Sequence, residues 1–305
     1  MIDIVALGEP MIEFNEEPDG RYRQGFGGDT SNAAIAAARL GARVRYVTLV
    51  GNDHFGDLLM ELWRVEGVDT AFVGRHAEAA TGVYVVNHTS AGHAFTYLRK
   101  GSAASLMTPA DVPSTSLAGA RFLHVSAISE AISATARETV AHAIAAAKRA
   151  GTKVSYDTNL RLGLWSLEAA RETTAATAAT ATILKTSIED ARQLIGLQAA
   201  DAVADHYLAA GPELVVVTLG AEGVLAASAG QRRRFQAMTV NAVDATGAGD
   251  AFAGALLAEL SSGSDPFTAA RFANAAAALA TTGFGAVAPL PLRGDVEALL
   301  ASAQS

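Results

Sequence analysis

Residues 243–252 read VDATGAGDAF and lead into an alanine-rich pattern that predicts a helix from Ala251. Backbone N–H groups at the start of a helix have no partner within it, and the helix dipole adds partial positive charge there. Gly247 and Gly249 carry no side chain that would keep an anion away. Asp250 adds a carboxylate that can take a proton from an attacking hydroxyl. The stretch therefore predicts either a phosphate cradle with an adjacent base or a small-residue turn whose aspartate caps the helix.

The chain has 305 residues, half of them hydrophobic and 18% charged, which suffices for one large domain or a domain with a satellite. A net charge of −8 argues against nucleic acid or an acidic membrane as a partner. Because cysteine is absent, disulfides, cysteine metal sites and thiol nucleophiles are excluded. The first ten residues reach Glu9 too early for a signal peptide, and no apolar run is long enough to span a membrane. We expect a soluble, cytoplasmic protein.

Hydrophobic periodicity predicts strands that alternate with helices, which is typical of a largely parallel sheet covered on both faces. The predicted strands are 2–7, 44–50, 71–73, 122–126, 153–157, 182–185 and 214–218. The predicted helices are 33–40, 55–66, 134–150, 168–178, 188–195, 202–210, 251–262, 266–281 and 294–301. Hairpin patterns cover 11–14 with 21–26, 81–87 with 93–98 across a turn at 88–92, and 223–228 with 232–236. The first two hairpins do not fit the parallel sheet and predict a small separate sheet, a lid.

Polar residues and glycines follow several predicted strands, at the end where open α/β sheets bind ligands. These loops are 8–9, 27–32, 157–161, 185–189, 218–223 and the stretch at 243–252. The sequence has no G-x-x-x-x-G-K-[ST] loop, no complete G-x-G-x-x-G, no H-E-x-x-H and no G-x-S-x-G. The glycine loop before Asp250 is therefore the strongest candidate for a phosphate site.

Two stretches resemble signatures of the ribokinase-like (PfkB) carbohydrate kinases. Residues 27–34 read GGDTSNAA, with RLG at 39–41, and residues 244–252 read DATGAGDAF. The resemblance extends over essentially the whole chain. It implies an α/β fold with three αβα layers, a mostly parallel central sheet and a small β-sheet lid. The main nucleotide- and substrate-binding domain would comprise residues 1–10, 27–75 and 99–305, and the lid residues 11–26 and 76–98.

Within the family, the sequence is most similar to 2-keto-3-deoxygluconate kinases, through YLRKGSAA at 97–104 and DTNLRLGLW at 157–165. A sugar acid needs a cation for its carboxylate, which arginine supplies with a two-pronged fork. Arg99 and Arg161 are the candidates, although either residue alone also fits a solvated surface arginine. The alternatives are a kinase of a neutral sugar such as fructose or ribose, a nucleoside kinase, or a non-catalytic sensor of sugars or nucleotides.

The resemblance also implies cofactors and roles for individual residues. ATP would bind with Mg²⁺, and K⁺ is a further candidate. Asp250 would be the base, and the N–H groups of Ala248, Gly249 and Asp250 would face the γ-phosphate, with Gly247 in the same loop. The other implied residues are Gly28, Asp29, Asn32, Tyr84, Tyr97, Arg99 and Arg161 for the acceptor; Thr218, Gly220, Gly223 and Asn274 for the nucleotide; Glu189 for Mg²⁺ through water, with Thr186 at the position of the family's asparagine; and Asp244 and Thr246 for the monovalent cation. The two tyrosines also fit ordinary strand packing, and Asn274 also fits a helix surface.

The predicted lid hairpins expose strand edges and apolar faces, which a second subunit would cover. We therefore expect a homodimer or a higher homo-oligomer formed through the lid.

Overall fold

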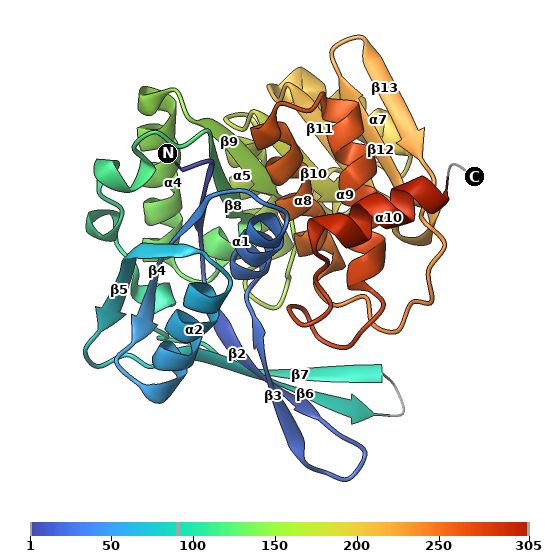
Figure 1. The fold of residues 1–305 in the computed structure, drawn as a ribbon. Coiled ribbons are helices and arrows are strands. Elements are labelled where there is room, and N and C mark those ends of the chain that lie inside the picture. Colours follow the sequence, from blue (N-terminus) through green and yellow to red (C-terminus); the bar gives the residue numbers. More distant parts are fainter. Residues whose placement is uncertain (1, 90–91, 304–305) are drawn as a thin grey trace.

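The computed structural model describes residues 2–89 and 92–303, which form two β-sheets with helices packed on both faces of the larger one (Figure 1). Strands of the larger sheet have the order β13-β12-β11-β10-β9-β8-β1-β4-β5. The seven from β11 to β5 are parallel, whereas β12 and β13 form an antiparallel hairpin at one edge. The fold class predicted from the sequence is confirmed.

The larger sheet comprises β1 (Ile4–Leu7), β4 (Val44–Gly51), β5 (Asp69–His76), β8 (Phe122–Ser126), β9 (Lys153–Asp157), β10 (Ile183–Ser187), β11 (Leu214–Thr218), β12 (Val224–Ser228) and β13 (Gln231–Phe235). The helices are α1 (Asp29–Arg39), α2 (His54–Val65), α3 (Ala127–Ala131), α4 (Ala134–Ala150), α5 (Leu167–Ala178), α6 (Ile188–Ile195), α7 (Ala200–Ala210), α8 (Ala248–Ser262), α9 (Pro266–Ala280) and α10 (Arg293–Ser302).

The sheet separates two hydrophobic cores, because successive side chains of a strand point to opposite faces. In β1, Ile4 and Ala6 belong to one core, and Val5 and Leu7 belong to the other. The first core is closed by α1, α2, α8, α9 and α10, and the second by α4, α5, α6 and α7. A strand buried on both faces reads as a continuous apolar run, which is why these strands were predictable.

Two predicted helix starts were wrong by several residues. Helix α1 begins at Asp29 rather than Ala33, and α8 begins at Ala248 rather than Ala251. The first turn of α1 reads DTSN, and that of α8 contains Gly249 and Asp250, so the apolar pattern begins only after these residues of weak helix propensity. In the structure, both helices therefore begin at residues that were predicted to bind ligands, Asp29 in α1 and Ala248 in α8. The short helix α3 was also missed.

The smaller sheet has the order β3-β2-β6-β7 and extends below the main body in Figure 1. It consists of β2 (Met11–Glu16), β3 (Tyr22–Gly27), β6 (Gly82–Thr89) and β7 (Gly92–Leu98). Two antiparallel hairpins are joined through a parallel β2–β6 pair. Residues 90–91 of the predicted second turn lie outside the described residues.

Helices α1 and α8 approach each other closely because both carry small residues at their contact. A Cβ on Gly254 would lie 2.3 Å from the Ala33 carbonyl oxygen and 2.8 Å from the Ala36 Cβ. No side chain larger than a hydrogen fits there without moving a helix. This close packing brings the N-termini of the two helices together.

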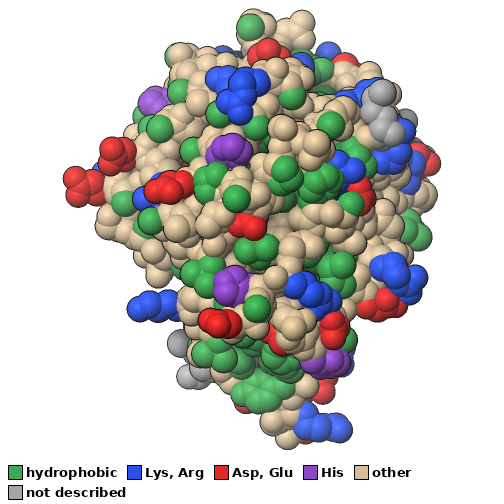
Figure 2. Space-filling model, turned by 90° about the vertical axis from the view of Figure 1, so that its left-hand side faces the viewer, with side chains coloured by type: hydrophobic (Ala, Val, Ile, Leu, Met, Phe, Trp, Pro, Cys, Tyr) green, Lys and Arg blue, Asp and Glu red, His purple; other side chains and the backbone are tan. Residues whose placement is uncertain are grey.

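Charged side chains of both signs are scattered over the face in Figure 2, while hydrophobic ones gather at its lower end. The smaller sheet forms that end, and its exposed hydrophobic residues include Tyr22, Phe95 and Leu98. Within residues 2–89 and 92–303, no helix is long and apolar enough to cross a membrane.

Candidate active site

The N-terminus of α8 forms the floor of the site. Gly247 caps the helix with φ of 76°, and a Cβ there would lie 2.9 Å from the Ala286 Cα. Both conditions require glycine. The Ala248 N–H donates to the Ala245 carbonyl at 3.2 Å, so this predicted phosphate donor has a partner within the chain. The following N–H groups, of Gly249 and Asp250, lie in the first turn, where helices hold anions.

Asp250 is held by the first residues of α1. The Asn32 side-chain amide donates to the Asp250 carboxylate over 2.8 Å, across 218 positions of sequence. Burial, followed by the nearby charge of Asp29, raises the pKa of Asp250 to about 7. A carboxyl group with this pKa accepts a proton readily near neutral pH, as a general base must.

A buried lysine completes the centre. Lys185 on β10 forms an ion pair with Asp157 on the neighbouring strand β9, with 2.7 Å between Nζ and Oδ2. A Cβ on Gly249 would lie 3.3 Å from this Nζ, which places the ammonium group beside the start of α8. Burial opposes the charge of Lys185, but Asp157, with Asp250 and Asp190, raises its pKa above the usual value. The centre therefore combines a buried carboxyl group of raised pKa, a fixed cation and a helix N-terminus.

Residues predicted to bind the acceptor lie around the start of α1. Gly28 has φ of 101°, and a Cβ there would lie 2.3 Å from the Glu9 carbonyl oxygen. The Asp29 carboxylate accepts from the Asn159 amide at 3.0 Å, which ties the 157–165 loop to α1. The Asn32 Oδ1 atom is buried without a hydrogen-bond partner among the described residues, so it can accept a hydrogen bond from a sugar hydroxyl.

The two tyrosines come from the smaller sheet. Tyr84 lies over Gly27, where a Cβ would be 2.5 Å from the phenolic oxygen, and it donates to Glu13 at 2.5 Å. Tyr97 lies beside Tyr84, with 5.8 Å between ring centroids, and is 45% exposed. Tyr84 thus closes over the start of α1, while Tyr97 keeps an open face.

The two arginines have different surroundings. Arg99 is buried and forms an ion pair with the fully buried Glu9, whose other oxygen accepts from the Ser102 hydroxyl at 2.6 Å. Arg161 is exposed, and within the described part of the chain it has no carboxylate partner. Arg99 is therefore not the free cation that the sequence suggested, because a buried glutamate already balances its charge.

On the nucleotide side, loop geometry depends on glycines. The Thr218 hydroxyl donates to the Thr186 carbonyl at 3.4 Å. Gly220 and Gly223 have positive φ, and a Cβ on Gly223 would lie 2.0 Å from the Phe235 carbonyl oxygen. Asn274 donates to the Gln236 carbonyl at 2.7 Å, which fixes the chain after β13. Its amide is therefore engaged in the protein itself.

The residues predicted to bind metal ions differ in their exposure and in their hydrogen-bond partners. Glu189 is exposed, whereas the next residue, Asp190, faces inward and accepts from the Thr158 hydroxyl at 3.0 Å. Asp244 accepts from Thr246 at 2.7 Å through one oxygen and from the Gly285 N–H at 2.9 Å through the other. Across residues 2–89 and 92–303, no group of three or more histidine or acidic side chains is arranged to hold a metal ion. Mg²⁺ carried by a nucleotide needs only one or two protein carboxylates, so the inward-facing Asp190 fits that ion better than Glu189.

Comparison with known proteins assigns the chain to a family. The family model of pfkB family carbohydrate kinases matches residues 1–293. The chain belongs to the PfkB family of carbohydrate kinases. It is 36% identical to the 2-dehydro-3-deoxygluconokinase of Thermoproteus tenax, covering 98% of this chain and 91% of that one. It is also 35% identical to a fructokinase of Klebsiella pneumoniae, covering 96% and 98%.

A solved structure agrees with this assignment. The fructokinase of Vibrio cholerae O395, in its form with fructose, ADP and calcium bound, superposes with a TM-score of 0.90 at 32% identity, covering 98% of this chain and 99% of that one. The family's activity is thus established as phosphorylation of a carbohydrate, while its substrates differ among these similar relatives.

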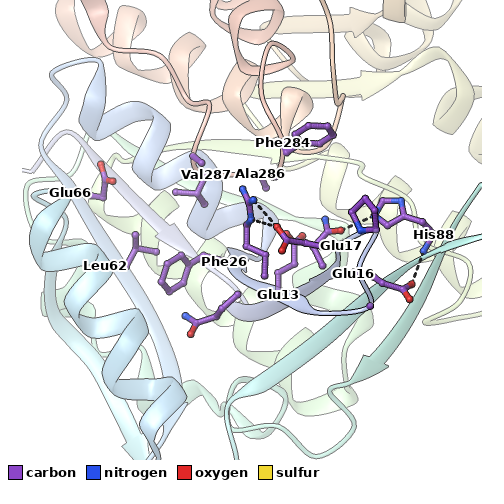
Figure 3. Close-up of a pocket in the computed structure, with 18 of the residues that line it drawn as sticks. Glu13, Glu16, Glu17, Phe26, Leu62, Glu66, His88, Phe284, Ala286 and Val287 are labelled. Atoms are coloured by element: carbon purple, nitrogen blue, oxygen red, sulfur yellow. Dashed lines mark hydrogen bonds and ion pairs between the residues drawn. The ribbon is translucent and has the colours of Figure 1, made fainter.

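A cavity of about 980 Å³ lies beside the kinase centre, between the β2–β3 hairpin, α2 and the segment after α9 (Figure 3). Its walls include Phe26, Leu62, Phe284 and Val287, with Glu13 at the side shared with Tyr84. Asp250 and Lys185 do not line it. The cavity therefore does not include the centre formed by Asp250 and Lys185.

Sequence reasoning missed the roles of Lys185, Asp157 and Glu9. Lys185 and Asp157 are paired residues in the register of two neighbouring parallel strands. Opposite charges near the carboxyl ends of two otherwise apolar strands were a usable signal. Glu9 had no comparable signal, since its partner Arg99 lies 90 positions away.

Proposed function

We propose that this kinase transfers the γ-phosphate of ATP to the primary hydroxyl of a sugar acid, namely 2-keto-3-deoxygluconate, to give its 6-phosphate. The observation that carries the transfer chemistry is the convergence of Asp250, Lys185 and the α8 N-terminus. Asp250 takes the hydroxyl proton while the hydroxyl oxygen attacks the γ-phosphorus in line, and ADP leaves. Lys185 and the N–H groups of Gly249 and Asp250 stabilise negative charge on the transferred group.

Support for an acidic acceptor comes from the loop that carries Arg161. That loop is fixed to α1 through Asn159 and Asp29, next to the residues proposed for sugar hydroxyls. Arg161 is exposed and has no carboxylate partner among the described residues, although its Nη1 atom donates to the Leu160 carbonyl at 2.9 Å. A relative named 2-dehydro-3-deoxygluconokinase supports the same substrate. Arg161 is therefore the proposed contact for the sugar carboxylate. Arg99 is proposed as a second contact, whose charge is balanced by Glu9.

A kinase of a neutral sugar is the second candidate, and a specific observation favours it. Glu9 balances the charge of Arg99, so the buried part of the acceptor side offers no net cation. A relative named fructokinase is almost as similar to this chain. Fructose is the first neutral sugar to test.

The acceptor is identified by measuring ADP release with 2-keto-3-deoxygluconate, 2-keto-3-deoxygalactonate, fructose, ribose and adenosine. If the acceptor is a sugar acid, kcat/KM should be highest with one of the two keto-deoxy acids. A higher kcat/KM with fructose or ribose would replace it with the second candidate, and no turnover with any acceptor would support a sensor.

Mg²⁺ would accompany ATP and neutralise its phosphates, with Asp190 as the proposed protein carboxylate in place of Glu189. K⁺ near Asp244 and Thr246 stays a proposal, because both oxygens of Asp244 already accept hydrogen bonds within the chain. Activity in KCl compared with choline chloride at equal ionic strength tests it, and equal rates would remove K⁺ from the account.

We also propose that the four-stranded sheet acts as a lid that excludes water during transfer. Its exposed Tyr22 and Leu98, at 45% and 64% exposure, support pairing with a second subunit in solution. A monomeric mass by light scattering at working concentrations would contradict the expected homodimer.

A further inference from the structure

Glu9 is a buried acid for which the transfer chemistry has no use. Its side chain is fully enclosed and makes two polar contacts, with Arg99 through one oxygen and with the Ser102 hydroxyl through the other. A buried carboxylate is costly unless it is paired, so the pair must be considered as one unit. That unit carries no net charge when both groups are ionised.

Only one edge of the Arg99 guanidinium group has a hydrogen-bond partner among the described residues. Its Nη2 atom donates to Glu9, while its Nε atom is buried and has no partner in the described part of the chain. The guanidinium carbon lies 5.5 Å from the centroid of the Tyr97 ring, which contributes a second fixed surface. A buried N–H without a partner is unusual in a folded protein and indicates a group that a ligand can satisfy.

The pair lies next to the proposed acceptor residues. Residues 8–10 pass against the start of α1, where the Glu9 carbonyl is 2.3 Å from the position of a Gly28 Cβ. Tyr97, which contacts Arg99, also contacts Tyr84 above Gly27. The Arg99–Glu9 pair thus lies at the start of α1, the helix that carries Asn32 and its unsatisfied Oδ1 in its first turn.

We infer that Glu9 sets the kinase's preference between acidic and neutral acceptors, by orienting the Arg99 fork and cancelling its charge. The inference rests on the proposed function, since it concerns the acceptor of the same reaction. With Glu9 ionised, Arg99 offers directional N–H donors that suit a hydroxyl, a carbonyl or a carboxylate. Without the charge of Glu9, Arg99 becomes a desolvated cation that strongly favours a carboxylate.

The test compares kcat/KM for 2-keto-3-deoxygluconate and for fructose in wild type and Glu9→Gln. Glutamine keeps the shape and an accepting oxygen but removes the negative charge. We expect the acid-to-fructose ratio to rise roughly tenfold, through a lower KM for the acid at unchanged kcat, since bonds to charged groups are the strong ones. Glu9→Asp, which restores the charge, should return the ratio toward that of the wild type.

The matched control is Glu66→Gln, which removes the same charge from another Arg–Glu pair, with Arg39, away from the acceptor side. Its ratio should equal that of the wild type. If Glu9→Gln does not fold, Ser102→Ala removes one hydrogen bond to Glu9 and should shift the ratio in the same direction by roughly twofold.

An unchanged ratio in Glu9→Gln, or in Ser102→Ala when only that variant folds, would overturn the inference, as would an equal change in Glu66→Gln. Failure of the proposed function looks different. In that case the wild type itself would turn over neither acceptor, or would turn over fructose alone, before any variant is made.

Discussion

Two buried ion pairs serve opposite ends of the proposed reaction, and their surroundings differ. The side chains of Lys185 and Asp157 are 9% and 3% exposed, and those of Arg99 and Glu9 are 10% and 0% exposed, so both pairs are equally desolvated. Two further carboxylates, Asp250 and Asp190, act on Lys185, whereas Arg99 forms an ion pair with Glu9, and the only further carboxylate that acts on Glu9 within the described residues is Asp29. The ammonium group of Lys185 is therefore surrounded by more than one carboxylate, whereas the guanidinium group of Arg99 and its partner Glu9 together carry no net charge.

We propose that the first pair acts in phosphoryl transfer and that the second acts in recognition of the acceptor. A buried lysine among carboxylates is suited to meet the phosphates of a nucleotide, because its charge stays fixed where phosphoryl charge develops. Arg99, whose charge is balanced by Glu9, can donate hydrogen bonds to an acceptor that carries little or no charge. Breaking the first pair should change kcat, and altering the surroundings of the second should change KM for the acceptor.

The largest expected effect comes from Lys185→Met. Loss of the ammonium group beside Gly249 should lower kcat by about 10²–10³-fold, as for the loss of one preorganised donor at a reacting centre. Because Asp157 would then be left unpaired, the double variant Lys185→Met/Asp157→Asn serves as the control. It should recover thermal stability while staying inactive in steady-state ADP release. Recovery of activity together with stability would make Lys185 merely structural.

The second prediction compares the two arginines. Arg161→Ala should raise KM for the keto-deoxy acid by about 10–100-fold, since a charge-assisted hydrogen bond contributes about 1.5–3 kcal/mol. Its KM for fructose should change little. Arg99→Ala should affect the acid less than Arg161→Ala does, because Glu9 already balances its charge. The reverse order, measured in the same assay, would contradict the placement of the free cation at Arg161.

The third prediction is the acid limb of the pH profile. Burial raises the pKa of Asp250 to about 7, so the carboxyl is protonated below that pH and cannot accept the hydroxyl proton. The kcat/KM should fall about tenfold for each pH unit below this pKa. Burial also raises the pKa of Glu130 to about 7, but this residue bonds to Tyr156 and Thr177 outside the site. Glu130→Gln should therefore leave the acid limb of the pH profile unchanged. Loss of the acid limb in that variant would assign it to Glu130 instead of Asp250.

The smallest effect concerns the packing that joins the two helix N-termini. Gly254→Ala places a methyl group against the Ala33 carbonyl and should lower the free energy of unfolding by about 1–3 kcal/mol. It should also lower kcat by moving Asn32 away from Asp250. Gly294→Ala in α10 is the control, since a Cβ there meets nothing within 4 Å. Equal thermal unfolding temperatures for the two variants would show that the α1–α8 approach is not tight.

The sequence predicted the parallel sheet because strands such as β1 and β11 are apolar on both faces, and it predicted the glycine loop before Asp250 because that spacing is local. It did not predict contacts between residues distant in the chain. Asn32 and Asp250 are joined by packing of α1 on α8, which depends on Gly254, and Glu9 meets Arg99 only when β7 ends beside the chain after β1. The sequence also did not show that, on α6, Glu189 is exposed while the next residue, Asp190, accepts a hydrogen bond from Thr158, so the choice of Mg²⁺ carboxylate stays a proposal.

The central claim is that Asp250 is the base for phosphoryl transfer. The most direct measurement is single-turnover transfer from ATP to the acceptor in Asp250→Asn at pH 8, with ATP binding measured in parallel. Burial raises the pKa of Asp250 from 3.8 to about 7, so the stability of the fold falls as the pH rises from about 4 to about 7, and the full cost of ionising the group is present at pH 8. The neutral variant should therefore be at least as stable as the wild type at pH 8. We expect the transfer rate to be lower by about 10²–10⁴-fold while the affinity for ATP is retained. Transfer within tenfold of the wild-type rate would contradict it.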